Sequence, residues 1–372
     1  MKSIEPVNMS SIPPKIIGTG LIALDIVLDS NRNLLTYGLG GSAGNVLSIL
    51  AALGWNSSPI GKLGCDVAAD IILEEFRSLK ANLELIVQEH SVPTPVIYQH
   101  QLDDSSGKTH KFSFACPVCG EKRAWHSPSI QMPSKEVLEA VKPDVIYMDR
   151  ATLVGIQIAE FYKNQNVLIF FEPSEVGNDT QLFSKALAIA DVVKYADDRL
   201  DDLEAFDRSH VFVEICTMGS EGLKYRAPSL GNDWVHLDAF TAPNVIDTSG
   251  AGDWCTSGML YYLFDRDPNC SIDKVTYNRL NEALRFGQAL SALNCMAIGA
   301  RGLTKALNKN KINKLAVGLQ KTKLNFDFLE ASLEASNILR EAWSNLITSR
   351  LTPSRSKVKL DSEHRVCCHT TL

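Results

Sequence analysis

The segment 247–253, with the sequence DTSGAGD, places small residues and a carboxylate directly before an apolar helical stretch. Backbone N–H groups at the start of a helix can bind an anion, and Gly250, Ala251 and Gly252 carry no side chain large enough to shield them. Asp253 lies in the first helical turn beside this predicted anion hole. A carboxylate there can accept a proton from a hydroxyl while the hole binds a transferring phosphoryl group. The segment therefore favours phosphoryl transfer to an alcohol over its alternative, a Gly-rich turn with a capping Asp.

Two other glycine patterns are weaker signals. Residues 18–23 (GTGLIA) match the dinucleotide-binding pattern, but the residues after them indicate a strand at least as well as a helix. No acidic residue that could bind a ribose follows about twenty positions later. Residues 107–109 (GKT) end like a phosphate-binding loop, but Leu102 stands where that loop needs its first glycine. We therefore interpret neither segment as a nucleotide site.

The elements that must position the 247–253 segment alternate along the chain. Residues 15–18 indicate a first strand. Apolar side chains recur at helical spacing across 46–53, with Gly54 where a helix C-cap falls. A second helix is expected from Asp66, its N-cap, to about residue 79.

From Val145 onward the alternation becomes regular. Four compact apolar strands are expected, with helical segments between them, at 145–148, 167–171, 191–194 and 211–216. This pattern predicts βαβ units and a parallel sheet covered by helices on both faces. We expect one domain over 14–350. The polar and basic residues 351–372 are expected to form a mobile tail.

The stretch 93–125 breaks this pattern because it is polar, rich in β-forming residues and without a helical period. Two β segments, 96–102 and 111–114, are joined by a turn at 103–107. An isolated hairpin is marginal in water and leaves open edges. We therefore expect a β-flap that packs on its parent domain or on a second copy of itself.

Composition excludes several classes of protein. The 372 residues are 45% hydrophobic and 22% charged, which excludes collagen-like, low-complexity and largely disordered chains. A formal net charge of −6 argues against a general nucleic-acid binder, because phosphate neutralisation needs clustered cations. No apolar run is long enough for a membrane-spanning helix, and residues 1–15 lack the apolar core of a signal peptide. The odd count of nine Cys favours reduced thiols, and we expect a cytoplasmic protein.

The motifs together resemble those of the ribokinase or PfkB family of sugar and nucleoside kinases. Residues 247–253 resemble that family's C-terminal signature, and residues 40–45 (GGSAGN), followed by Leu53 and Gly54, resemble its N-terminal one. Weaker matches occur in the right order at 20–25, 61–66 and 217–222. The resemblance covers about residues 14–345 and implies a three-layer αβα sandwich with a mostly parallel central sheet, in which the flap is a lid.

The resemblance also implies roles on the acceptor side of the site. Asp253 would be the general base that deprotonates the acceptor hydroxyl, and residues 250–252 would bind the γ-phosphate of ATP. Asp25, Gly41 and Asn45 would form hydrogen bonds with sugar hydroxyls.

On the nucleotide side, the resemblance implies that Thr217, Gly219 and Gly222 line the ATP groove. ATP would bind with Mg²⁺. Some members of the family hold a monovalent cation such as K⁺ beside the anion hole. Asp247 would be its ligand here, or would merely cap a turn.

The sequence departs from the family where an N-x-x-E motif is usual, because Ala196 and Arg199 occupy those places. That motif helps to organise Mg²⁺ and phosphates. A nearby acidic cluster could substitute for it or could be a solvated helix face: Asp197, Asp198, Asp201 and Asp202. Glu172 stands where an Asp is common. Because of these changes, weak activity and an unusual substrate both remain open alternatives.

Two flap cysteines, Cys116 and Cys119, have the spacing of a zinc knuckle. Two ligands do not close a tetrahedral zinc site, and no second Cys pair has standard spacing. Other residues that could contribute are His110, His126, Cys367, Cys368 and His369. The alternative is a reduced flap turn, so we predict no metal site from this motif.

The function that the sequence predicts is an ATP-dependent kinase acting on a primary hydroxyl of a small sugar or sugar derivative. The alternatives are a nucleoside kinase and a catalytically weak sensor that binds a sugar or nucleotide. We also expect a homodimer in which the flap closes over the substrate and contacts the second subunit. In that hypothesis Phe114 faces the partner.

Overall fold

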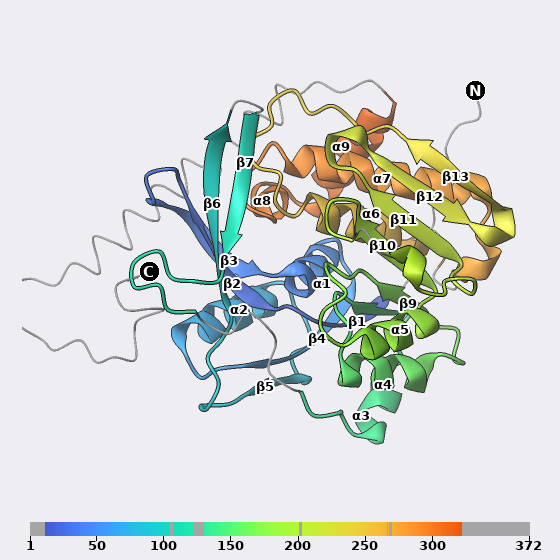
Figure 1. Cartoon of the computed structure of the whole chain (residues 1–372), viewed down its shortest axis with the longest axis horizontal. Coiled ribbons are helices and arrows are strands. Elements are labelled where there is room, and N and C mark those ends of the chain that lie inside the picture. The colour runs from blue at the N-terminus through green and yellow to red at the C-terminus, as the bar shows by residue number, and fades with distance from the viewer. Residues whose placement is uncertain are drawn as a thin grey trace, which may run out of the picture.

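The computed structural model describes residues 12–104, 107–122, 130–200, 203–265, 267 and 270–321. Its strands form a large main sheet and a small second sheet (Figure 1). The main sheet has the order β13-β12-β11-β10-β9-β8-β1-β4-β5. Its strands are β1 (Lys15–Thr19), β4 (Asn56–Leu63), β5 (Ile86–Gln88), β8 (Val145–Met148), β9 (Leu168–Phe171), β10 (Val192–Ala196), β11 (Val213–Thr217), β12 (Leu223–Ala227) and β13 (Gly231–Leu237).

Helices cover both faces of the main sheet (Figure 1). One face bears α1 (Ser42–Ala52), α2 (Val67–Ser78), α6 (Ala251–Asp265), α7 (Tyr277–Asn294) and α9 (Lys309–Gln320), with the short α8 (Gly302–Ala306) between the last two. The other face bears α3 (Lys135–Val141), α4 (Leu153–Tyr162) and α5 (Thr180–Ile189).

Side-chain alternation along the strands explains why both faces are buried. Ile16 and Phe170 belong to the core under α1 and α6, whereas their neighbours Ile17 and Phe171 belong to the core under α4 and α5. Successive strand residues point to opposite faces, so a strand that is apolar throughout needs helices on both sides. From β5 to β11 all neighbouring strands are parallel, and only β12 and β13 run antiparallel. The prediction of a three-layer αβα sandwich with a mostly parallel sheet is confirmed.

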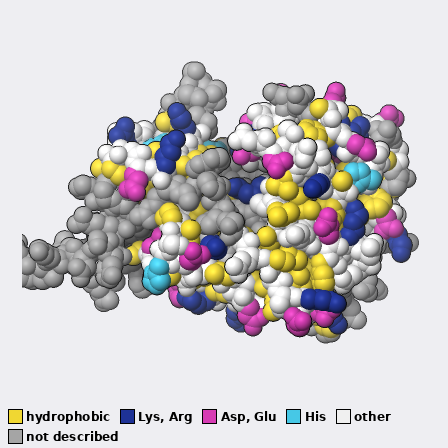
Figure 2. Space-filling model, turned by 60° about the horizontal axis from the view of Figure 1, so that its bottom comes forward, with side chains coloured by type: hydrophobic (Ala, Val, Ile, Leu, Met, Phe, Trp, Pro, Cys, Tyr) yellow, Lys and Arg dark blue, Asp and Glu magenta, His cyan; other side chains and the backbone are white. Residues whose placement is uncertain are grey.

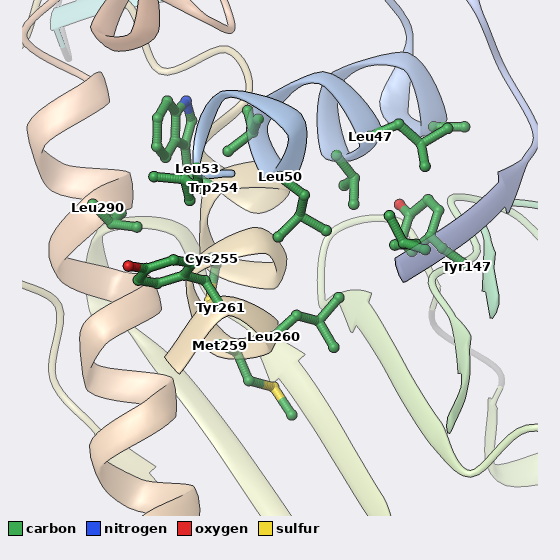
Figure 3. Packing of buried hydrophobic residues seen from close by; sticks show 14 of the residues in the cluster. Leu47, Leu50, Leu53, Tyr147, Trp254, Cys255, Met259, Leu260, Tyr261 and Leu290 are labelled. Carbon is green, nitrogen blue, oxygen red and sulfur yellow. The ribbon is translucent and has the colours of Figure 1, made fainter. Parts of the chain in front are cut away.

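The core between α1, α6 and α7 fixes the start of α6 in space. Leu50 of α1, Trp254 and Leu260 of α6, and Leu290 of α7 are fully buried where these helices meet (Figure 3). Gly258 lets α6 and α7 approach closely, because a Cβ there would lie 2.6 Å from a Cα of α7. Removing a side chain of this kind typically costs about 2–5 kcal/mol, so the helix and its N-terminus are firmly anchored.

The second sheet is the lid, with the order β3-β2-β6-β7. Its strands are β2 (Ala23–Leu28), β3 (Leu34–Gly40), β6 (Val96–Asp104) and β7 (Gly107–Ser113). The predicted flap hairpin corresponds to β6 and β7, but half of the lid comes from the hairpin β2–β3, which the sequence analysis did not assign to it. The parallel pairing of β2 with β6 joins the two halves, and it explains why neither hairpin has to be stable alone.

The carboxyl ends of the parallel strands lie along one edge of the sheet, and near the middle of the strand order β1 lies between β4 and β8. The strand order reverses at this point, and ligands of open α/β sheets bind in the crevice that such a reversal creates. In the described residues, no helix is long and apolar enough to cross a membrane. The tail that we predicted at 351–372 lies outside the described residues.

Candidate active site

The first turn of α6 presents backbone N–H groups at this edge of the sheet. Gly250 has a φ of +74°, and a Cβ there would lie 2.6 Å from both Cβ and O of Ala300. Trp254 secures the same turn, because its backbone N–H donates to Gly250 O and its indole Nε1–H donates to Ala300 O, both at 2.9 Å. Ala251 N–H donates to Thr248 O at a long 3.3 Å. These contacts hold the turn in place, and its backbone N–H groups are of the kind that bind anions at helix N-termini.

Asp253 is half-buried beside this turn and accepts a hydrogen bond from Asn45 Nδ2 at 2.8 Å. Desolvation raises the pKa of Asp253 well above its ordinary value, and the nearby Glu172 carboxylate acts in the same direction. The hydrogen bond from Asn45 and the charge of Lys194 oppose this rise. A carboxylate with a raised pKa accepts a proton more readily at neutral pH, as a general base must.

A buried ion pair supports the first turn of α6 from below. Lys194, on β10, pairs with Glu172, which follows β9, and Lys194 Nζ also donates to Gly252 O at 3.2 Å. Glu172 Oε2 accepts from Tyr147 OH at 3.2 Å and from Thr256 Oγ1 at 2.6 Å. Burial is the largest single effect on Lys194 and lowers its pKa, but Glu172, Cys255 and Asp253 together outweigh burial and raise the pKa. The pair of Lys194 and Glu172 therefore connects the first turn of α6 to strands β9 and β10 of the sheet.

Asp149 organises the other wall of the site. It follows β8, is 2% exposed, and accepts from Leu21 N–H at 2.9 and 3.1 Å and from Ala43 N–H at 3.0 Å. The second contact caps the N-terminus of α1 from a distant strand. Gly20 is required here, because a Cβ on it would lie 1.9 Å from the Asp149 carboxylate. Asp149 therefore holds the 20–21 turn and α1 together.

Asp25, Gly41 and Asn45 meet where β2 passes the start of α1. Gly41 has a φ of +77° and its N–H donates to Asp25. Desolvation raises the pKa of Asp25 to about 7, although the Arg301 guanidinium opposes it. Asp25 Oδ1 and Asn45 Oδ1 are buried and accept no hydrogen bond. Buried acceptors without donors are costly, so these two atoms fit the hydroxyl groups of a bound sugar.

Asp247 is 4% exposed and belongs to a dense hydrogen-bond cluster. Its carboxylate accepts from five donors: Gln99 Nε2, Gln101 Nε2, Ser249 N, Ser249 Oγ and Gly299 N. A cation needs free carboxylate lone pairs, and N–H and O–H groups occupy those of Asp247. Asp247 therefore does not fit the role of a ligand for K⁺ that the resemblance implied.

The predicted nucleotide residues lie at the same edge of the sheet, farther along it. Thr217 is the last residue of β11. It pairs with Ala196 of β10, which is two residues beyond Lys194 on that strand. Gly219 has a φ of +54° and open space around it, whereas a Cβ on Gly222 (φ +103°) would lie 2.1 Å from a backbone oxygen of β13. Gly222 is thus explained by close backbone approach. No hydrogen bond or ion pair of the described residues joins these three residues to Asp253.

The departures from the N-x-x-E motif lie on this side as well. Ala196 ends β10, and Asp197, Asp198 and Arg199 after it are exposed. Asp201 and Asp202 lie outside the described residues. Among the residues that are described, no group of three or more His, Cys, Asp or Glu side chains converges to hold a metal ion.

The flap residues that we singled out take ordinary positions. Cys116 is buried and Cys119 is exposed. The other zinc candidates except His110 lie outside the described residues. Phe114 packs against Leu21, Ala23 and Ile97 of its own chain. Phe114 is only partly buried in this small core of the lid, and its contact with a partner subunit stays a prediction.

Sequence reasoning missed Asp149, Lys194 and Gln99. Asp149 directly follows a buried parallel strand, and an acidic residue at that point is a signal that could have been used. Lys194 interrupts an otherwise apolar strand, which is a second signal, since a buried charge requires a partner. The contact of Gln99 with Asp247 spans 148 positions, and the sequence contains no local sign of it.

The comparisons with known proteins agree with this geometry. Residues 151–306 match the model of the pfkB family carbohydrate kinases. A ketohexokinase of Mus musculus is 23% identical over 318 residues, which cover 78% of this chain and 98% of that relative.

Two solved structures show the same fold. The ribokinase of Arabidopsis thaliana, complexed with ribose and ATP, superposes with a TM-score of 0.60 at 18% identity and covers 82% of this chain and 99% of its own. A nucleoside kinase of Burkholderia thailandensis, in complex with inosine, superposes with a TM-score of 0.58 at 20% identity, over 81% and 95% of the two chains.

Proposed function

We propose that this chain, a carbohydrate kinase of the pfkB family, transfers the γ-phosphate of ATP to a primary hydroxyl of a small sugar. The observation that carries the proposal is the hydrogen bond from Asn45 to Asp253. It joins the wall with two unpaired buried acceptors to the carboxylate beside the anion hole. A hydroxymethyl group of a sugar held by Asp25 and Asn45 would then lie next to Asp253.

In the proposed reaction, sugar hydroxyls donate to Asp25 Oδ1 and Asn45 Oδ1 and orient the ring. Asp253 accepts the proton of the reacting sugar hydroxyl. The hydroxyl oxygen then forms a bond with the γ-phosphorus of ATP as the bond between that phosphorus and the ADP oxygen breaks. The N–H groups of Gly250 and Gly252 bind the charge on the transferring group. Because Ala251 N–H already donates to Thr248 O, it contributes less.

Mg²⁺ would arrive as the ATP complex and neutralise phosphate charge. It needs only one or two protein carboxylates, since phosphates and water supply its other ligands. Asp197 and Asp198 are exposed at the end of β10, and these side chains fit that limited role. We propose Thr217 and Gly219 as contacts of the nucleotide.

The test is a panel of pentoses, hexoses and nucleosides in which ADP formation is measured with the wild type and with Asp253→Asn. We expect sustained turnover with at least one sugar, and a fall in kcat of about 100-fold or more in the variant, the usual scale for a lost general base. ATP binding, measured by calorimetry, should stay unchanged. Near-normal turnover in the variant would remove Asp253 from this role, and binding without turnover in the wild type would favour a sensor.

A nucleoside is the second candidate substrate, and the lid supplies an observation for it. Phe112 pairs with Gln99 and His110 with Gln101 across β6 and β7, so both rings lie on the lid face that turns toward Asp247. Their centroids are 4.7 Å apart, and Phe112 is 40% exposed. An exposed ring on that face can stack on a base. Turnover of nucleosides but not of sugars would select this alternative.

We also propose a homodimer that forms through the lid. Apolar side chains are exposed on three of its strands: Leu34 and Leu35 on β3, Leu102 on β6 and Phe112 on β7. Edge strands that expose apolar residues favour pairing with another chain. Leu35→Asp should dissociate the dimer, whereas Phe114→Asp should instead damage the core of the lid. Light scattering that shows a monomer at tens of micromolar wild-type protein, with and without sugar, would contradict the proposal.

A further inference from the structure

A buried glutamine of the lid contacts the segment that leads into the anion hole. Gln99 on β6 is 1% exposed, and its Nε2 donates to both carboxylate oxygens of Asp247, at 2.9 and 3.0 Å. Gln101 donates to the same carboxylate at 3.3 Å. On β7, His110 Nδ1 lies 3.2 Å from Thr248 Oγ1. The lid therefore meets the 247–248 segment through polar groups, with Gln99 at the most buried point.

Asp247 carries this contact onward to the anion hole. Its Oδ1 accepts from Ser249 N–H at 2.9 Å and from Ser249 Oγ at 2.7 Å. Its Oδ2 accepts from Gly299 N–H at 2.9 Å. Ser249 directly precedes Gly250, so the position of the Asp247 carboxylate determines where the loop enters the first turn of α6.

The same lid strand also reaches the sugar side. In the register of β2 with β6, Asp25 pairs with Ile97 and Val27 pairs with Gln99. Gln99 is two residues beyond Ile97 and points to the same face of the sheet, about 7 Å farther along the strand. The strand β6 therefore links the two parts of the proposed site. Ile97 lies beside Asp25, the proposed sugar-binding carboxylate, and Gln99 contacts Asp247 of the proposed phosphate-binding loop.

We propose that Gln99 is a positioning residue that couples occupation of the sugar site to the geometry of the anion hole. The inference rests on the proposed function. When a sugar orders the lid through Asp25, Gln99 holds the Asp247 carboxylate in place, and Ser249 and Gly250 take the position in which their loop binds the transferring phosphoryl group. With the sugar site empty, we expect Gln99 to hold Asp247 less firmly, and a buried carboxylate that is short of a donor loosens the loop.

The first test separates kcat from binding. Gln99→Ala should lower kcat by roughly 10- to 100-fold, the factor expected from a lost buried hydrogen bond to a charged group. The Kd of ATP in the absence of sugar should change less than twofold. Gln165→Ala is the matched control, because Gln165 is exposed and bonds only within its own helix end, to Phe161 O. An unchanged kcat in Gln99→Ala would overturn the proposal.

The second test exchanges donor and acceptor. Gln99→Glu places two carboxylates face to face and should lower kcat at least as far as Gln99→Ala. The double variant Gln99→Glu/Asp247→Asn restores one donor and one acceptor with their roles reversed, and it should recover at least tenfold of the kcat lost. Such a recovery would show that the contact between residues 99 and 247 carries the effect, and a double variant as poor as the sum of its parts contradicts the coupling.

The third test does not depend on turnover. Hydrogen exchange of the backbone amides of Ser249–Asp253 should slow when sugar binds to the wild type, and should not slow in Gln99→Ala. Equal protection in both proteins overturns the coupling, whatever the activity. If the wild type phosphorylates no member of the panel, the proposed function fails by itself, while ligand-dependent exchange still decides whether Gln99 links the two sites.

Discussion

The proposed acceptor side and the proposed nucleotide side of the site are built differently. On the acceptor side, Asp149, Asp247 and the pair of Lys194 with Glu172 are buried polar groups whose partners come from distant strands and helices. On the nucleotide side, Asp197, Asp198 and Arg199 are exposed, and the glycines offer bare backbone. The surface in Figure 2 shows acidic and basic side chains interspersed over the residues it colours.

This difference indicates which side of the site tolerates amino-acid substitutions. A buried charge without its partner costs several kcal/mol, so the acceptor side cannot lose one member of its network without losing stability or geometry. Exposed charges contribute about 1 kcal/mol or less, because water screens them. The positions that differ from the expected N-x-x-E motif lie on the exposed side, whereas the first turn of α6 has its buried supports. Four predictions test this contrast, and they are given in order from the largest expected effect to the smallest.

Replacing Lys194 by Met should be the most damaging of these changes. The variant leaves Glu172 buried without its cation, and we expect a loss of about 3–5 kcal/mol in the free energy of unfolding. Urea denaturation measures it. The matched control is Lys185→Met, because Lys185 is exposed on α5. Its free energy of unfolding should stay within about 0.5 kcal/mol of the wild-type value. A loss below about 1 kcal/mol at Lys194 would mean that the network under the anion hole does not require its charge.

Two glycines of the proposed nucleotide side should lose stability to different extents when replaced by Ala. Gly222→Ala forces a Cβ against a backbone oxygen at 2.1 Å with φ +103°, and should cost about 2–3 kcal/mol of stability. Gly219→Ala meets open space and should cost about 1 kcal/mol. If Gly219 contacts the nucleotide, its variant should instead weaken ATP binding by about fivefold, or about 1 kcal/mol, in calorimetry. The reverse pattern would exchange the two roles.

Asp25 should make sugar affinity and stability depend on pH in opposite directions. Its pKa of about 7 lies above its unfolded value, so its contribution to stability is present at acid pH and is lost as pH rises through 7. Sugar hydroxyls bind the ionised form, which is roughly a tenth of the total at pH 6, so affinity should rise about tenfold from pH 6 to 8. Thermal melts and calorimetry across pH 5–8.5 measure both.

Asp25→Asn is the comparison for that titration. Its melting temperature should fall less between pH 5 and 8.5, and its sugar affinity should be weak and independent of pH. A wild-type affinity that stays constant between pH 6 and 8 would show that Asp25 does not titrate near neutrality in the free protein.

The smallest effect is expected from rebuilding the missing motif. Ala196→Asn/Arg199→Glu adds an acidic side chain at an exposed position, and ADP formation at limiting Mg²⁺ should rise by roughly twofold to fivefold. Arg77→Glu makes the same change of charge on exposed α2 and should have no effect. A rise of 100-fold would show that the nucleotide side depends on these positions as strongly as the acceptor side depends on its buried network.

Much of the architecture could be predicted from local pattern. The apolar strands at 145–148 and 167–171 were placed to within one residue, because strands buried on both faces are apolar throughout. Asp66 does cap its helix, accepting from Ala69 N–H at 3.0 Å. The lid was only half predicted. Its strands β2 and β6 pair across about 70 positions, and neither alone shows that it leaves the main sheet.

The sequence alone was enough to predict an anion hole and a general base at the start of α6, because Gly250 to Asp253 are consecutive and the N–H groups of a helix end follow from local geometry. Only the tertiary structure decided the chemistry around them. Asn45 reaches Asp253 across 208 positions, and Gln99 donates to the carboxylate of Asp247 across 148 positions. The pKa values of Asp25 and Asp253 are raised by desolvation. Burial and the pairing of charges depend on which distant segments the fold brings together, and no stretch of sequence contains that information.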